Sequence, residues 1–304
     1  MRGIVKITSC RGKPIKPQIE IIAEIYYYYD KMKEMKGEPM LREPVVAGMF
    51  YEKDAHALKK QVHKYLDADT AKSRAKGIVV PHAGYAYSGG VAGAVYSGIT
   101  MPDTFVILGP NHTGYGESVS VMNEGAWRTP LGDVKINEPM ADAIIKKCEN
   151  AKADTAAHLK EHSIEVQLPF LQELSRGAAI VPVALGEPDT EVLRELAEAI
   201  ADVIKGKNTV IMASTDLTHY ETARAAAEKD GKIMEAIKNM DEEKMALAVK
   251  EYDISMCGWM PVYVMLAACK RSGASEAKII KYAHSGEISG DNENVVGYCG
   301  AVIV

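Results

Sequence analysis

Short apolar runs alternate with longer amphipathic segments along most of this 304-residue chain. The short runs, rich in Val and Ile, predict strands at 78–80, 105–108, 178–185, 209–213, 277–284 and 295–304. The longer segments predict helices at 88–98, 139–148, 161–174, 190–205, 221–239, 241–250 and from 257 onwards. This alternation is typical of a sheet covered by helices, so we predict an α/β fold. In the helix at 88–98, Gly89, Gly90 and Gly93 would allow close packing on the sheet.

The chain is long enough for one large domain, and we predict a single domain over residues 40–304, with a central mostly parallel or mixed sheet flanked by helices. The first 39 residues differ in composition, with eight Lys/Arg against five Asp/Glu and a run of tyrosines at Tyr26–Tyr29. We therefore interpret residues 1–39 as an N-terminal extension that is dispensable for folding, with Met40 as a candidate start. The alternative is an arm that covers a neighbouring subunit.

Composition limits the classes of partner. The net charge is −5 and residues 40–304 contain no block of Lys and Arg, which argues against nucleic acid and favours a small molecule or a peptide. No apolar run reaches the length of a membrane span and the first residues lack the apolar core of a signal peptide, so we expect a cytoplasmic protein without membrane contact. The five cysteines are scattered, which argues against a disulfide framework or a zinc ribbon.

Three of the predicted strands lead into polar residues. The strand at 78–80 is followed by His82 and the strand at 105–108 by His112. The strand at 209–213 is followed by Asp216 and His219. Because ligands in open α/β sheets bind beyond the carboxyl ends of the strands, we expect these side chains to meet in one crevice.

His82 and His112 are candidate metal ligands, because imidazole is the commonest metal ligand in proteins and both residues closely follow a strand. We expect them to come from adjacent strand ends. Cys257 is a candidate third ligand, since it precedes the apolar stretch 259–269 and so lies at a predicted helix N-terminus, where the helix dipole favours a thiolate. The alternative is that the two histidines are unrelated structural residues.

Four residues are candidates for proton transfer or support. The spacing of Asp216 and His219 allows an acid/base pair in which the carboxylate orients the imidazole. The alternative is that Asp216 caps the following helix and His219 only packs. Glu161 and His162, predicted to share one helical turn, are candidates for support behind the metal ligands.

Six sequence motifs, in order over residues 41–304, resemble those of one family. They are REPVVAGMFY, PHAGYAYSG, LGPNH, EHSIEVQLPFL, STDLTHY and CGWMP, and together they resemble the Memo family. The resemblance implies a fold similar to that of the class III extradiol dioxygenases of the protocatechuate dioxygenase B type. In those enzymes two histidines and a glutamate hold a non-haem ferrous iron, and a further histidine acts as acid and base.

The resemblance also implies roles for four residues of this chain. His82 and His112 correspond to the two iron-binding histidines and His219 to the acid/base histidine, while Cys257 takes the place of the glutamate. Because two histidines and a cysteine form a softer set of ligands, we expect a single mononuclear site for iron (Fe²⁺) or copper. Eukaryotic members of the family are described as metal-dependent redox proteins, and prokaryotic members often occur with a radical-SAM protein, which is thus an implied partner.

Three functions remain open from the sequence. The first is a metal-dependent oxidoreductase with a dioxygenase-like crevice, in which His219 and Asp216 handle protons. The second is a non-catalytic module that binds a peptide or partner protein in the same crevice, with Tyr85, Tyr87 and Trp127 as candidates for lining the groove. The third is a metal-dependent hydrolase with His219 as base. A thiolate ligand favours redox chemistry over hydrolysis.

Overall fold

The computed structural model describes residues 40–175 and 177–304, so the predicted extension at 1–39 lies outside the described residues. The described part of Leu41–Val304 is built on a main sheet of nine strands. These strands are β2 (Gly77–Val80), β3 (Thr104–Pro110), β4 (Val119–Val121), β7 (Lys152–Ala153), β8 (Ala179–Leu185), β9 (Thr209–Ser214), β10 (His219–Glu221), β11 (Ala277–His284) and β12 (Val295–Ile303). Their order is β10-β12-β2-β9-β3-β8-β4-β7, and β11 pairs with β12.

The centre of this sheet is parallel. Strands β2, β9, β3 and β8 pair in parallel, whereas β12 and β4 run antiparallel to β2 and β8 on either side. Every residue of β2 and β3 is buried, which explains why their sequences GIVV and TFVILGP do not alternate between apolar and polar residues. The sheet is therefore mixed, as predicted.

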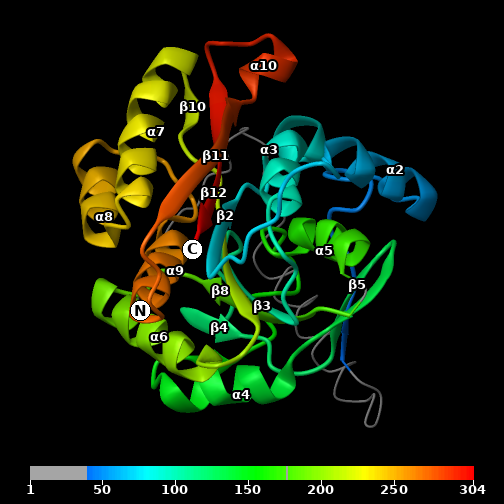
Figure 1. Ribbon diagram of the computed structural model, residues 1–304, viewed down its shortest axis with the longest axis vertical. Helices are drawn as coiled ribbons and strands as arrows, with labels where there is room; N and C mark the ends of the chain where they lie inside the picture. The colour runs from blue at the N-terminus through cyan, green and yellow to red at the C-terminus, as the bar shows by residue number, and fades with distance from the viewer. Residues whose placement is uncertain (1–39, 176) are drawn as a thin grey trace, which may run out of the picture. The chain divides into compact units, whose positions relative to one another are not determined.

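Helices cover both faces of the main sheet (Figure 1). On one face lie α2 (Ala55–Tyr65), α3 (Tyr85–Ser97), the 3-10 helix η1 (Glu165–Gln167) and α5 (Leu168–Leu174). On the other lie α6 (Thr190–Ile204), α7 (Ala223–Lys238), α8 (Glu242–Glu251) and α9 (Trp259–Arg271), while α4 (Glu138–Lys147) packs on α6 and α10 (Gly286–Ser289) follows β11. This arrangement confirms the predicted α/β fold with a mixed sheet between helices. Among the described residues, no helix has the length and apolar character needed to span a membrane.

Three short strands form a second sheet. They are β1 (Leu41–Arg42), β5 (Ala126–Thr129) and β6 (Gly132–Lys135), in the order β1-β5-β6. The hairpin of β5 and β6 lies in a polar segment rich in turn residues, and for this reason its hydrophobic pattern does not indicate strands.

Two helices begin later than the hydrophobic pattern predicts. The predicted helix at 161–174 is wrong in its first part, because Glu161–Ile164 form an irregular turn and α5 begins only at Leu168. The Glu161 carboxylate accepts hydrogen bonds from the backbone N–H groups of His162 and Ser163, which competes with helical hydrogen bonding. In the same way α7 begins only at Ala223, because the residues before it pair as β10.

Two glycines of α3 pack against α2, whereas the sequence pattern places them against the sheet. A Cβ atom on Gly93 would lie 2.2 Å from the carbonyl oxygen of Tyr65, and one on Gly89 would lie 2.6 Å from the Tyr65 ring. The end of α2 therefore lies directly on the backbone of α3. The expectation that these glycines face the sheet is wrong for Gly89 and Gly93.

We expect Gly93→Ala to destabilise the protein by about 3 kcal/mol or more, because the added methyl group meets rigid backbone. Gly90→Ala is the matched control on the same helix. Its Cβ atom would lie 3.6 Å from the Lys281 Nζ, an ordinary contact, so stability should stay the same or rise by up to about 1 kcal/mol. Urea denaturation of both variants tests this, and equal effects would contradict the packing described.

Candidate metal centre

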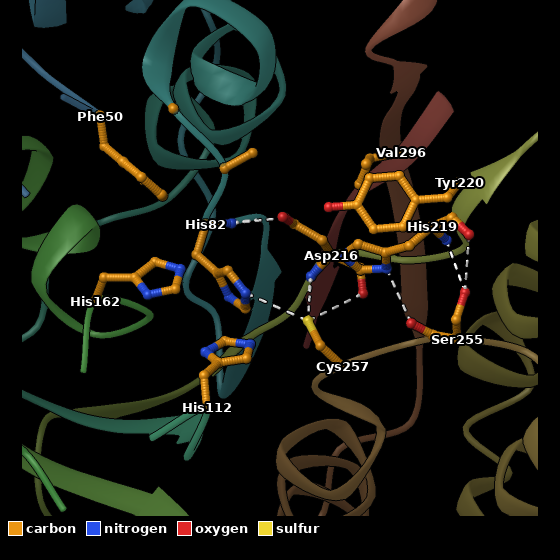
Figure 2. Close-up of a pocket in the computed structure, with 12 residues that line it drawn as sticks. Phe50, His82, His112, His162, Asp216, His219, Tyr220, Ser255, Cys257 and Val296 are labelled. Atoms are coloured by element: carbon orange, nitrogen blue, oxygen red, sulfur yellow. Dashed lines mark hydrogen bonds between the residues drawn. The ribbon is translucent and has the colours of Figure 1, made fainter. Parts of the chain in front are cut away.

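The polar residues that follow the central strands lie together at one edge of the sheet. His82 follows β2, His112 follows β3, and Asp216 follows β9. Because β9 lies between β2 and β3, the expectation that the two histidines come from adjacent strands is wrong. Their ring centroids are nevertheless only 5.2 Å apart, and a pocket of about 450 Å³ opens in front of them (Figure 2).

Cys257 approaches the histidines from the loop before α9. The next residue, Gly258, lies so close to the end of β9 that a Cβ atom on it would be 2.5 Å from the Ser214 carbonyl oxygen. Its N–H donates a hydrogen bond of 3.0 Å to Thr215 Oγ1. This close approach brings Cys257 Sγ to 3.3 Å from His82 Nε2. The thiol thus lies at the N-terminus of α9 and faces the pocket.

His82, His112 and Cys257 form a group that could hold a metal ion. One donor atom from each residue lies within 4.8 Å of the other two. His82 is 2% exposed, whereas 35% of the His112 side chain is exposed, so the group is buried behind and open towards the pocket. Three protein donors with an open side are typical of catalytic metal sites, because structural sites usually have four protein ligands.

Glu161 fixes the orientation of His112 from behind. Its buried carboxylate accepts hydrogen bonds from His112 Nδ1 (2.9 Å) and from the His112 backbone N–H (2.6 Å). Burial is the largest influence and disfavours the charged form, but the hydrogen bond from His112, the nearby His112 and His162 rings and the Ser163 N–H together outweigh it, so the pKa of Glu161 is lowered. Because a carboxylate only accepts, the hydrogen of the neutral His112 ring lies on Nδ1, and the lone pair of Nε2 is left for a metal. Glu161 thus has the geometry expected of a supporting residue.

A second group of possible ligands, His112, Glu161 and His162, overlaps the first. Its carboxylate oxygens already accept four hydrogen bonds, which a metal ion would have to disrupt. We therefore take the first group as the candidate metal centre. The sequence predicts His162 behind the ligands, but in the structure its ring stacks on His112 at 4.9 Å between centroids and forms part of the pocket wall.

Burial and close contacts set the protonation of the candidate ligands. Burial lowers the pKa of His82, and the neighbouring His112 and His162 rings lower it further, so His82 is neutral. Burial also opposes the charge on His112, but contacts with Cys257 and Glu161 outweigh it and raise the pKa of His112 to about 10. Burial raises the pKa of the Cys257 thiol, against the expectation that the helix N-terminus makes it a thiolate. A metal ion would therefore have to displace protons from this group.

His219 and Asp216 both line the pocket but have other partners than expected. His219 Nδ1 donates to the carbonyl oxygen of Ser255 (2.9 Å), which leaves its Nε2 able to accept a proton. Asp216 accepts a hydrogen bond of 2.8 Å from the His82 backbone N–H. The residue that orients His219 is thus Ser255 and not Asp216. The alternative that Asp216 caps the next helix is also wrong, because Thr222 caps α7.

Tyr85 and Trp127 lie in the core, and the expectation that they line the crevice is wrong. The Tyr85 hydroxyl is buried and donates to a backbone carbonyl. The Trp127 ring is fully buried, with the Arg42 guanidinium 4.3 Å from its centroid. The aromatic residues of the pocket are instead Phe50 and Tyr220, which extend towards it from opposite sides in Figure 2. Both belong to the motifs quoted above, but no local pattern of spacing distinguishes them.

A buried ion pair holds the turn that contains Glu161. Arg42 in β1 pairs with Glu165, and both side chains are fully buried. Arg42 also donates to the backbone carbonyls of His158 (3.1 Å) and Glu161, while Glu165 accepts from the Tyr51 hydroxyl (2.6 Å). Removing one partner of such a pair typically costs about 3–5 kcal/mol, because the other charge stays buried. Arg42, near the start of the described residues, therefore fixes the position of this turn.

Comparison with known proteins agrees with the six motifs. A family model described as Memo-like protein matches residues 42–302. The chain belongs to the Memo family. A MEMO1 family protein of Methanopyrus kandleri is 45% identical over 279 residues, which cover 86% of this chain and 99% of that protein. MEMO1 family proteins of Methanobrevibacter smithii and Thermotoga neapolitana are each 41% identical over 280 residues, covering 86% and 87% of this chain and 99% and 100% of the relative.

The structure shows why the motifs of this Memo family member occur together. PHAGYAYSG and LGPNH supply His82 and His112, and CGWMP supplies Cys257. EHSIEVQLPFL supplies Glu161 behind His112, and REPVVAGMFY supplies the arginine that holds this turn. Motifs that are far apart in the sequence therefore contribute to one site.

His158 lies outside the pocket and provides a test of the burial described. It is fully buried beside Trp127, its Nδ1 atom has no hydrogen-bond partner, and its Nε2 atom lies 3.3 Å from the Ser120 carbonyl oxygen. Burial lowers the pKa of His158 to about 4.

We expect the metal-free protein to lose stability through His158 as the pH falls from 6.5 to about 4, because the unfolded chain binds the proton first. The loss from this group is at most about 3 kcal/mol. His158→Phe should lack this contribution, so its free energy of unfolding should depend less steeply on pH in this range. Urea denaturation of both proteins measures the difference, and identical pH dependence would show that His158 is not buried in the neutral form.

Proposed function

We propose that this Memo family member is a metal-dependent oxidoreductase that binds one iron or copper ion at His82, His112 and Cys257. The observation that carries the proposal is the convergence of two imidazoles and a thiol on the inner wall of one pocket, with donor atoms within 4.8 Å of one another. A sulfur donor favours iron or copper over a hard cation such as Mg²⁺. The bound ion would supply one-electron chemistry at the open side of the group.

The donor set fits such an ion in this structure. His112 is held with Nδ1 towards Glu161, so Nε2 faces Cys257 and the pocket. Burial excludes bulk water from the inner side of His82. Burial also keeps this imidazole neutral, which is the form that binds metals. These features support metal binding at this group.

We also propose that the crevice is related to that of the class III extradiol dioxygenases. Support comes from the position of the site at the carboxyl ends of parallel strands and from the histidine placed after each of β2 and β3. Cys257 stands where the resemblance places a glutamate. A softer ligand there favours a copper ion, or an iron ion with altered redox properties, over the ferrous iron of a dioxygenase.

In this proposal His219 transfers protons and Asp216 acts as a positioning residue. The Ser255 carbonyl holds His219 with Nε2 free at the pocket. Asp216 holds the backbone of His82 and also lies beside Cys257, since its own N–H donates to the Cys257 Sγ at 3.3 Å. Proton transfer and metal binding are thus assigned to different side chains of one pocket.

Cys257→Ser should be nearly free of metal at micromolar iron or copper. Loss of one ligand is expected to weaken binding by several kcal/mol, given that whole metal sites contribute on the order of 10 kcal/mol. Cys269→Ser is the matched control, because Cys269 is a fully buried cysteine in α9 away from the pocket. Anaerobic titration followed by elemental analysis measures both. Unchanged binding in Cys257→Ser and His82→Ala would overturn the metal site and leave the pocket as a binding site for a peptide or partner.

His219→Ala should keep its metal and lose turnover by about 10²–10⁴-fold, the usual contribution of a general acid/base. The measurement is oxygen consumption by the iron- or copper-loaded protein with ascorbate as electron donor, together with metal content. Ser120→Ala, a buried serine on β4, should leave both values unchanged. Metal loss in His219→Ala as large as that in Cys257→Ser would place His219 among the ligands and contradict the assignment.

A further inference from the structure

The hydroxyl group of Ser214 lies behind His82 at the end of β9 and is fully buried. Its Oγ atom has three partners: His82 Nδ1 at 3.0 Å, the Ser163 carbonyl oxygen at 2.7 Å and Gln167 Nε2 at 2.9 Å. A hydroxyl group has one hydrogen to donate and two lone pairs that accept. Three partners therefore use its full hydrogen-bonding capacity.

The chemistry of these partners decides where each hydrogen lies. The Ser163 carbonyl oxygen can only accept, so Ser214 donates its hydrogen there. The Gln167 amide nitrogen also donates to the Pro81 carbonyl (2.9 Å), and its oxygen accepts from the Tyr96 hydroxyl (2.8 Å), which fixes the amide with nitrogen towards Ser214. Ser214 is left with one lone pair for His82.

We propose that Ser214 is a positioning residue that holds His82 in the tautomer with hydrogen on Nδ1 and so turns the Nε2 lone pair towards Cys257. Gln167 and Tyr96 act through Ser214, as a chain of buried hydrogen bonds from α3 through η1 to β9. The role of Ser214 in metal binding rests on the proposed function, but the tautomer of His82 is a property of the metal-free protein. The two histidines thus differ, since His112 is held by a charged carboxylate and His82 by a neutral hydroxyl group.

The test is the tautomer of His82 in metal-free protein labelled with ¹⁵N in its histidines, measured by long-range ¹H–¹⁵N correlation spectroscopy at neutral pH. His82→Gln identifies the signals of this ring. We expect hydrogen on Nδ1 in the unmodified chain and a mixture of tautomers, or hydrogen on Nε2, in Ser214→Ala. Ser120→Ala, whose hydroxyl is equally buried but bonds to the Asp154 carbonyl, should leave the tautomer unchanged.

A second measurement is metal affinity by anaerobic titration. Ser214→Ala should bind iron or copper about 10–100-fold more weakly, as is typical when the partner of a ligating histidine is removed. Hydrogen on Nε2 in the unmodified chain would overturn the proposal, even if Ser214→Ala does not fold. An unchanged tautomer in a folded Ser214→Ala would overturn it too. The expected tautomer in a chain that binds no metal would support this inference and overturn the proposed function.

Discussion

The candidate metal centre depends on the buried carboxylate of Glu161. It accepts four hydrogen bonds, two from His112 and two from the backbone of its own turn, so it joins the end of β3 to the segment before α5. A buried charge without such donors would cost several kcal/mol, and these hydrogen bonds therefore set the position of His112 tightly. The Arg42–Glu165 ion pair fixes the same turn from its other side.

The segment 161–167 serves both candidate histidine ligands. Glu161 orients His112 directly, while the Ser163 carbonyl and Gln167 orient His82 through Ser214. The segment can do so because it is not a regular helix: its backbone and side-chain groups are free to bond to the strand ends. Its position decides whether the two Nε2 atoms face one point beside Cys257.

Local sequence predicts where the central strands end, but it does not predict which strands lie side by side or which distant residues contact the polar groups beyond them. Apolar runs such as GIVV define β2, so the position of His82 just beyond it could be predicted from local sequence. The placement of β9 between β2 and β3 is a long-range pairing that no periodicity encodes. The helix predicted from Glu161 failed because side-chain bonds to the backbone compete with helix formation. Trp127 could not be placed, because Arg42 and His158, which lie against its ring, are distant from it in sequence.

X-ray absorption spectroscopy of the protein loaded anaerobically with one equivalent of iron or copper tests the proposed metal centre most directly. We predict one sulfur and two imidazole nitrogens around the metal, with the remaining positions open to light atoms. The sulfur contribution should come from Cys257, which is the cysteine that lines the pocket among the described residues. A coordination shell without sulfur, or without imidazole, would contradict the metal centre described.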